Sequence, residues 1–197
     1  MVACACTLTV YSLRLNAWRL FSLPSASEQL TEHLNLGKAF YENPTTQTEA
    51  VAEFKKALAL KPDSVREQLN YALALLRAAK TEEAVALLEK IQQKDPQLPH
   101  TWFNLAIYYK HEGQFDKALE QFKGVVRLAP KEAVPHYNIG SIYRLQGKTA
   151  EAEKEMEMAR DLDPSLAAPH FQLFNLYRVQ RKMEQAQKEL AIFQERK

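Results

Sequence analysis

The sequence contains very little cysteine, and the two cysteines that it has stand close together near its start. They are Cys4 and Cys6 in a chain of 197 residues. No disulfide framework can therefore hold the fold, and cysteine usage does not fix the redox compartment. A Cys-x-Cys pair with no further ligands nearby is also a weak signal for a metal. We expect neither a bound metal nor a cofactor.

An excess of charge of one sign and a long apolar run are missing as well. The 26 basic and 24 acidic residues leave a net charge of +2, which is too small to indicate nucleic acid or an anionic membrane as a partner. Residues 2–13 are mostly apolar, but a helix that spans a bilayer needs about 20 such residues. Hydrophobic residues make up 46% of the chain and charged residues 25%, which is ordinary for a soluble protein. We expect no nucleic acid and no membrane as a partner.

Residues 1–27 contain no acidic residue and carry Arg14 and Arg19. A secretory signal would need a basic start before the apolar run, and this start is absent. A transit peptide is rich in Arg and Ser and poor in acids, so it fits better. A loosely ordered leader, or a start codon placed too early, explains the composition equally well. The cytoplasm is the favoured compartment, with targeting or export instead if residues 1–27 are a cleaved leader.

Motifs that mark catalysis are missing too. The sequence has no Gly-x-Ser-x-Gly and no His-Glu-x-x-His. Residues 147–149, Gly-Lys-Thr, resemble the end of a phosphate-binding loop, but Gly140 stands seven residues before Gly147 and that motif requires five. We expect Gly147 to serve a bend and Thr149 to cap a helix. The chain is therefore not expected to be an enzyme.

Three histidines invite a metal interpretation because each follows a proline: His100, His136 and His170. None has a second His four residues on, and none has a Cys or carboxylate at ligand spacing. Half-buried structural rings are the better interpretation for all three.

Regularly spaced residues, in contrast, are abundant. Two sets of positions recur at one constant interval, namely Ala50, Ala84, Ala118, Ala152 and Ala186, and Pro62, Pro96, Pro130 and Pro164. The clearest copy of this repeat spans residues 99–130 and holds two helical patterns that are hinged at residues 111–114. Apolar residues recur there at intervals of three and four, which places each set on one face of a helix. Pro130 ends the second helix because it has no N–H to donate and its ring clashes with the preceding turn.

Trp102, Leu105, Tyr109, Ala118 and Phe122, followed by a proline, resemble the tetratricopeptide repeat, whose period is about 34 residues. The resemblance covers residues 30–197 and implies an all-α fold, a right-handed α-solenoid of five helix–turn–helix repeats. The expected organisation is a leader, residues 1–27, and one repeat domain, residues 28–197, with repeats at 30–64, 65–98, 99–132, 133–166 and 167–197. The resemblance is strong for the fold and weak for function, because repeat arrays mostly supply a surface and not a chemistry.

Local signals refine this expectation. Ser/Thr-x-x-Glu patterns that begin at Ser25, Thr46 and Ser64 predict capped helix N-termini. Repeat 1 has one extra residue in its turn, around Asn43-Pro44.

Repeat 5 departs from the family pattern. Phe174 and Phe193 occupy sites that hold small residues in the family, and no solvating helix follows the fifth pair. Solenoids need a polar terminal unit, so we expect exposed apolar surface at this end. This surface would favour a homodimer or an adjoining domain, and it would include Leu173, Leu176, Tyr177, Leu190 and Phe193.

The resemblance also implies a binding groove, because the first helix of each repeat lines the concave face in this family. One column on that helix holds an amide in every repeat: Asn35, Asn70, Asn104, Asn138 and Gln172. An amide side chain offers an acceptor and two donors, so a ladder of them can pair with the backbone of an extended peptide. The alternative is that these amides simply stay solvated.

Neighbouring columns make the groove aromatic and basic, which suits a partner with acidic and apolar residues. The candidate binding residues in these columns are Arg66, Arg77, Phe103, Lys110, Tyr137, Arg144, Phe171 and Arg178. Chaperone-binding members of the family clamp a carboxylate with a basic residue and two asparagines, followed by Lys and Arg in the third repeat. Here Val134 and Asn138 stand in place of that Lys and Arg, so the clamp is absent or incomplete.

The sequence thus predicts a non-catalytic protein–protein interaction scaffold that binds an extended peptide segment of a partner protein in its groove. The alternative is a structural dimerisation or docking module that acts through the uncapped C-terminal repeat.

Overall fold

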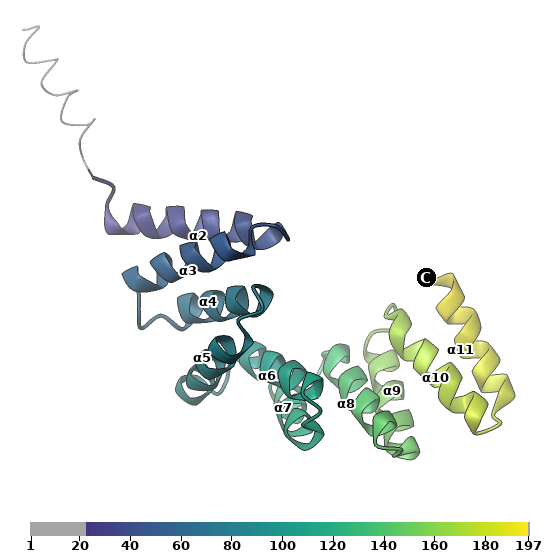
Figure 1. The fold of residues 1–197 in the computed structure, drawn as a ribbon. Helices are drawn as coiled ribbons and strands as arrows, with labels where there is room; N and C mark the ends of the chain where they lie inside the picture. The colour runs from purple at the N-terminus through teal and green to yellow at the C-terminus, as the bar shows by residue number, and fades with distance from the viewer. Residues whose placement is uncertain (1–22, 197) are drawn as a thin grey trace, which may run out of the picture. The chain divides into compact units, whose positions relative to one another are not determined.

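A computed structural model describes residues 23–196, so the expectations for Cys4, Cys6 and most of the leader lie outside the described residues. Residues 23–196 fold into α-helices joined by short turns and contain no strand, which confirms the all-α helical-repeat fold (Figure 1). The helices are α2 (Ala26–Glu42), α3 (Gln47–Leu60), α4 (Val65–Arg77), α5 (Thr81–Lys94), α6 (Pro99–His111), α7 (Phe115–Leu128), α8 (Ala133–Leu145), α9 (Thr149–Leu162), α10 (Ala167–Val179) and α11 (Met183–Glu195).

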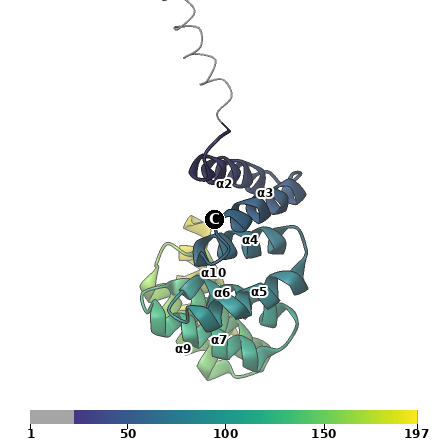
Figure 2. The same ribbon diagram turned by 90° about the vertical axis from the view of Figure 1, so that its left-hand side faces the viewer.

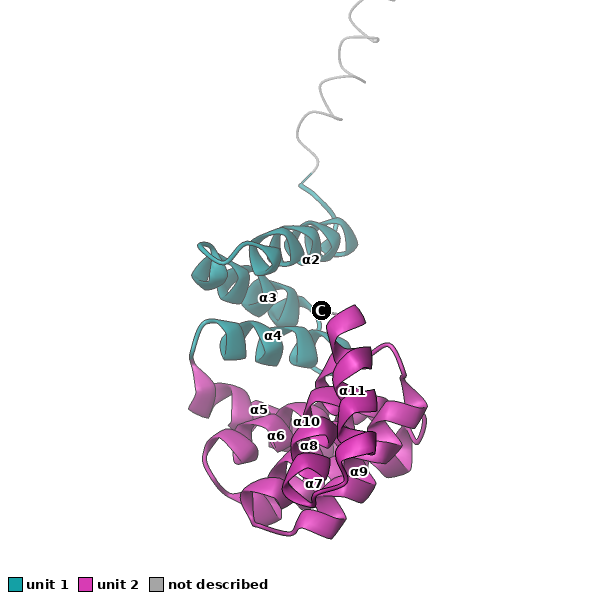
Figure 3. Cartoon of the chain, turned by 90° about the vertical axis from the view of Figure 1, so that its right-hand side faces the viewer, with its two compact units in different colours: residues 1–79 teal, residues 80–197 magenta. Residues whose placement is uncertain are grey.

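The helices group into two compact units, and the boundary falls between Ala79 and Lys80 (Figure 3). Unit 1 contains α2, α3 and α4, and unit 2 contains α5 to α11. The boundary lies in the turn between α4 and α5, within the range of the second repeat. None of the helices in the described part of the chain has the length and apolar character needed to cross a membrane.

Unit 1 is built around the hairpin of α2 and α3, which lie side by side, and α4 packs against α3 (Figure 2). Leu30, Ala50, Phe54 and Ala57 are buried at this contact. A Cβ atom at Gly37 would lie 2.9 Å from Cε1 of Phe54, which is closer than side-chain packing tolerates. Glycine at this position therefore lets the Phe54 ring reach α2.

The predicted helix starts are correct, but only one of the three predicted caps forms. Ser25 Oγ accepts from the N–H of Glu28 at 3.3 Å, and the Ser25 N–H donates to Glu28 Oε2 at 2.7 Å, which completes a capping box. Thr46 Oγ1 instead donates to the carbonyl of Phe40 at 3.0 Å. The Ser64 hydroxyl donates to the carboxylate of Glu67. Thr46 and Ser64 stand at the N-cap position, but their hydroxyls donate to these oxygens and do not accept from a backbone N–H of the helix.

The extra residue of repeat 1 is taken up by an Asx turn. Asn43 Oδ1 accepts from the N–H of Thr45 at 3.0 Å and from its hydroxyl at 2.9 Å. Such bonds offer the backbone an alternative to another helical turn, so α2 ends at Glu42.

Unit 2 repeats with the period that the sequence predicts. The first helix of each of its three complete repeats, α6, α8 and α10, has 13 residues. These helices begin at equal intervals along the chain, at Pro99, Ala133 and Ala167. Each pairs with the helix that follows it, and α7 and α9 also pack against the first helix of the next hairpin. Phe122 and Met156 are fully buried between successive hairpins.

The turns between paired helices also repeat. Backbone φ is positive at Ala79, Gly113, Gly147 and Arg181, at 57°, 70°, 73° and 61°, and these positions are spaced by the same constant interval. Gly147 thus serves the bend, as predicted. Thr149 does not cap α9, because it is the first residue of that helix and Lys148 stands at the N-cap position. Its hydroxyl faces the carbonyl of Gly147 at 3.5 Å.

The prediction of an exposed apolar surface on repeat 5 is largely wrong. Leu173, Leu176 and Tyr177 are buried because α10 packs against both α9 and α11. Phe193 is half-buried, and its ring lies 5.0 Å from that of Phe171, which lies 6.3 Å from the ring of Phe174. Leu190 is half-buried as well. The large residues at the small sites therefore form an aromatic cluster.

Candidate functional site

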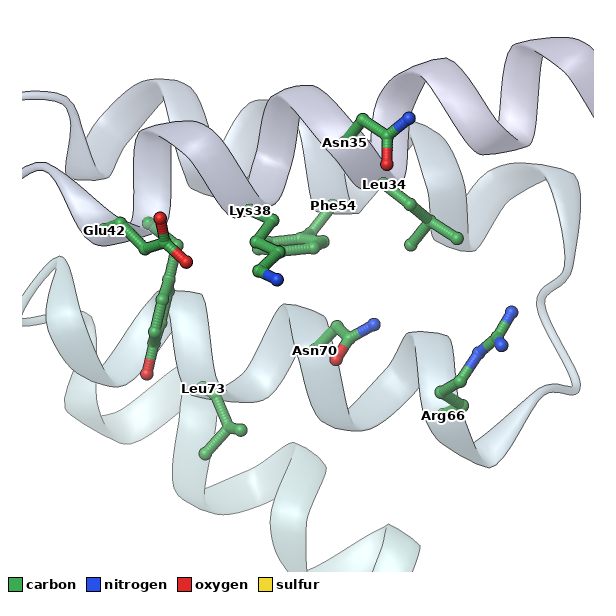
Figure 4. Close-up of a pocket in the computed structure, with 9 residues that line it drawn as sticks. Leu34, Asn35, Lys38, Glu42, Phe54, Arg66, Asn70 and Leu73 are labelled. Carbon is green, nitrogen blue, oxygen red and sulfur yellow. The ribbon is translucent and has the colours of Figure 1, made fainter.

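Unit 1 contains a cavity of about 470 Å³ in which side chains of α2 and α4 face one another (Figure 4). Apolar side chains and the ring of Tyr41 form much of its lining, and two asparagines and three charged side chains complete it. The lining residues are Leu34, Asn35, Lys38, Tyr41, Glu42, Phe54, Arg66, Asn70 and Leu73.

The two asparagines lie on opposite sides of this cavity, Asn35 on α2 and Asn70 on α4 (Figure 4). Asn35 is exposed and Asn70 is half-buried. Neither amide side chain hydrogen bonds to another group within residues 23–196. Each amide therefore keeps its donors and its acceptor available to a ligand.

The charges around the cavity differ in how far they are compensated. Arg66 Nη2 lies 2.6 Å from Oε1 of Glu67, and Arg66 Nε lies 3.0 Å from the same atom. Burial alone would raise the pKa of Glu67, but hydrogen bonds from Arg66 and Ser64 outweigh it and hold the pKa below its ordinary value. Lys38 forms no ion pair within the described residues and extends from α2 towards α4 (Figure 4). Lys38 is therefore the uncompensated cation of this cavity.

Arg77, the remaining predicted residue of unit 1, does not line the cavity. Its guanidinium lies 4.5 Å from the centre of the Tyr41 ring, in a cation–π contact that supports this wall. The lining side chains that the sequence did not predict are mainly apolar, above all Phe54 on α3. The signal that could have revealed Phe54 is Gly37, which opens α2 to its ring.

The predicted residues of unit 2 stand at equivalent positions on α6, α8 and α10, but two of their amides are already used. Asn104 Nδ2 donates to the carbonyl of His100 at 2.7 Å. Asn138 Nδ2 donates to the carbonyl of Val134 at 2.9 Å, and Asn138 Oδ1 accepts from Nζ of Lys110 at 2.8 Å. Asn138 is also buried. The amide column is therefore free in unit 1 and engaged at these two positions of unit 2.

The other predicted residues of unit 2 are accessible to differing degrees. Phe103 is half-buried and packs edge-on against the ring of Phe122 at 5.9 Å. Tyr137 and Gln172 are half-buried, and Phe171 is 40% exposed. A second cavity of about 400 Å³ lies beside Phe103, lined by Pro99, His100, Phe103, Val125, Ala129, Glu132, Val134 and Pro135.

The three predicted basic residues of unit 2, Lys110, Arg144 and Arg178, have no carboxylate partner within residues 23–196. Lys110 is half-buried, and burial lowers its pKa. Arg144 is exposed, and the guanidinium of Arg178 lies 5.4 Å from the centre of the Phe174 ring. None of the three forms an ion pair with a carboxylate within residues 23–196.

The structural interpretation of the histidines holds for two of the three. Nδ1 of His136 donates to Oε2 of Glu155 at 2.7 Å, and Nδ1 of His170 donates to Oε2 of Glu189 at 2.5 Å. Both rings are buried. His100 is exposed, so the half-buried ring expected there is wrong. The reason is register: His100 lies two residues before the column that His136 and His170 share.

No three His, Cys, Asp or Glu side chains come together to hold a metal ion in the part of the chain that the structure describes. The Gly-Lys-Thr segment, residues 147–149, has a structural role in the turn between α8 and α9, where Nζ of Lys148 lies 5.6 Å from the centre of the Tyr143 ring. The geometry offers amides, cations and apolar hollows, which are suited to binding a chain.

Two family models match the sequence. One, described as the Psidin N-terminal TPR repeats region, matches residues 42–139, and one for the tetratricopeptide repeat matches residues 134–166. A search of the curated proteins found no match.

Solved structures show the same fold at low sequence identity. MamA from Desulfovibrio magneticus RS-1 is 18% identical with a TM-score of 0.73, over 86% of this chain and 95% of that one. PilF from Pseudomonas aeruginosa is 16% identical with a TM-score of 0.77, over 88% of this chain and 79% of that one. At these identities the likeness shows the fold alone.

Proposed function

Since this chain belongs to the tetratricopeptide repeat family, whose members serve as non-catalytic interaction modules, we propose that it is a protein-interaction scaffold that binds an extended peptide. The cavity of unit 1 is the proposed peptide site. The partner is a protein, and its bound segment lies between α2 and α4.

The observation that carries this proposal is the pair of free amides at Asn35 and Asn70. An extended peptide has one N–H and one C=O per residue, and both must find partners when water is removed. Amides on two successive first helices can supply those partners whatever the peptide's side chains are. The apolar lining, with Phe54 and Leu73, can then take up a side chain of the peptide.

The test begins with a screen of the full chain against an array of immobilised capped peptides. The strongest binder is then titrated against wild type and variants by fluorescence anisotropy. Asn35→Ala and Asn70→Ala should each weaken binding by about 1–2 kcal/mol, the net value of one or two hydrogen bonds. Asn104→Ala is the matched control, because the Asn104 amide already donates within its own helix. Binding that tolerates Asn35→Ala and Asn70→Ala together would rule out this site.

The alternative of docking or dimerisation through repeat 5 rests on a smaller observation. Val179 is 76% exposed and Met183 is 53% exposed, at either end of the turn between α10 and α11. Light scattering over a range of concentrations separates the two functions. A dimer that becomes monomeric when Val179→Lys and Met183→Lys are combined would favour the alternative.

A further inference from the structure

A column of three cations runs through unit 2. Lys110, Arg144 and Arg178 are each the twelfth residue of a 13-residue helix, on α6, α8 and α10 respectively. These helices begin at equal intervals along the chain and belong to one compact unit, drawn in magenta in Figure 3. The three residues therefore occupy equivalent positions in successive hairpins.

These cations differ from several others in the chain, which are paired. Arg160 contacts both Asp161 and Glu189, and Lys182 contacts Glu153, at 2.8–2.9 Å. Lys110, Arg144 and Arg178 form no such pair with any carboxylate of residues 23–196. Their charge is therefore available to an acidic partner.

Lys110 is the most telling of the three. Its side chain is half-buried, and its ammonium donates to a neutral acceptor, Oδ1 of Asn138, at 2.8 Å. Burial of a cation without a counter-charge is unfavourable, and the same burial lowers the Lys110 pKa. An incoming carboxylate would supply the missing charge and accept a charge-assisted hydrogen bond from the ammonium.

Exposed apolar side chains are interleaved with the cations. Leu145 directly follows Arg144 and is 56% exposed, and Val179 directly follows Arg178 and is 76% exposed. Ile107 precedes Lys110 by three residues on α6 and is 40% exposed. A partner for this surface therefore needs apolar side chains as well as acids.

We propose that Lys110, Arg144 and Arg178 form an acidic-peptide site on unit 2. The site binds a segment of a partner protein in which Glu or Asp alternates with apolar residues. Lys110 anchors one carboxylate, while Leu145 and Val179 contact the apolar residues. The chain's own residues 1–27 cannot be the occupant, because they contain no acid. The site shares no residue with the cavity of unit 1.

The test uses three fluorescent synthetic peptides, each capped at both ends and about a dozen residues long. The first carries three glutamates among leucine and serine, and a set of these varies the interval between the glutamates from two to four residues. The second has Gln at each Glu, and the third has Lys. The full chain should bind the best Glu peptide at least about tenfold more tightly than its Gln counterpart, and salt should weaken that binding.

Lys110→Met should weaken binding of the Glu peptide about tenfold, and Lys110→Arg should retain most of the wild-type binding. Arg144→Gln and Arg178→Gln should each weaken it a few-fold. Lys123→Gln is the matched control, because Lys123 is an exposed lysine on α7 outside this column. A circular dichroism spectrum of each variant verifies that the helices are intact.

Equal binding of the Glu and Gln peptides, or full binding by a folded Lys110→Met variant, would overturn the proposal. Self-association that the three substitutions together abolish would also overturn it, by assigning the surface to a second copy of the chain. Asn35→Ala with Asn70→Ala should leave Glu-peptide binding unchanged, so failure of either site is seen separately from failure of the other.

Discussion

One position of the first helix holds Trp102 in repeat 3 and His170 in repeat 5, and both side chains hydrogen bond to a proline carbonyl. Trp102 Nε1 donates to the carbonyl of Pro96 at 2.9 Å. In repeat 5 the equivalent His170 presents Nε2 to the carbonyl of Pro164 at 3.2 Å. The second helix of repeat 5 supplies a partner for the other ring nitrogen, because Oε2 of Glu189 accepts from Nδ1 of His170.

In the third repeat the second helix accommodates the larger indole with a glycine. A Cβ atom on Gly124 would lie 2.1 Å from Cε3 of Trp102. Gly124→Ala should therefore destabilise the protein by about 1–3 kcal/mol, the usual cost of overpacking. The urea midpoint measures this change, and Lys123→Ala on the exposed side of the same helix is the control. A midpoint unchanged by Gly124→Ala would contradict the packing described here.

Glu67 makes stability depend on pH. Its pKa in the folded chain lies below the ordinary value of 4.5, so the carboxylate stabilises the fold above pH 4.5. This contribution is lost as pH falls through the folded pKa, when both states bind the proton. Glu67→Gln should cost about 2 kcal/mol near neutral pH, since charge-assisted hydrogen bonds are lost.

Urea unfolding at a series of pH values verifies this expectation. The wild type and Glu67→Gln should converge in stability as the solution becomes more acidic than pH 4.5. Glu49→Gln, which removes an exposed glutamate of α3, is the control and should change little. A gap between wild type and Glu67→Gln that stays constant into strong acid would show that ionisation of Glu67 contributes nothing.

Among the helices, the constant period of the sequence was enough to predict the helix–turn–helix repeats, and the Ser/Thr-x-x-Glu patterns predicted where α2, α3 and α4 begin. Periodic apolar residues and turn residues are local signals, and they recur in every repeat. The caps at Thr46 and Ser64 were predicted wrongly because both hydroxyls are oriented to donate to a nearby oxygen and do not accept from a backbone N–H. Thr46 donates to the carbonyl of Phe40, and Ser64 donates to the carboxylate of Glu67. These bonds depend on the folded conformation of each turn, which the local sequence pattern does not contain.

The turns with positive φ predict that two substitutions will change stability in opposite directions. Gly147 has a φ of 73° and open space around its Cα, so Gly147→Ala should cost about 1 kcal/mol from backbone strain alone. Arg181 has a φ of 61° at the equivalent turn and already bears this strain, so Arg181→Gly should change stability by no more than about 0.5 kcal/mol, in the stabilising direction. Chemical denaturation measures both. Destabilisation by Arg181→Gly equal to that by Gly147→Ala would refute the strain argument.

At the scale of the molecule, the sequence predicted the repeat architecture and a surface suited to binding, but not how the amides along it differ. It treated Asn35, Asn70, Asn104 and Asn138 as one ladder. Asn104 bonds back to its own helix, and Asn138 is held by Lys110 from a neighbouring helix. Such choices depend on rotamers and on how closely α6 and α8 approach, which a one-dimensional pattern does not contain.

The central claim is that the free amides of Asn35 and Asn70 bind an extended peptide. The most direct measurement follows the side-chain NH2 signals of ¹⁵N-labelled protein by NMR while the array-selected peptide is added, with signals assigned from the Asn→Ala variants. The NH2 signals of Asn35 and Asn70 should shift and saturate together, while those of Asn104 and Asn138 stay in place. Saturable peptide binding that leaves the Asn35 and Asn70 signals unmoved would contradict the claim.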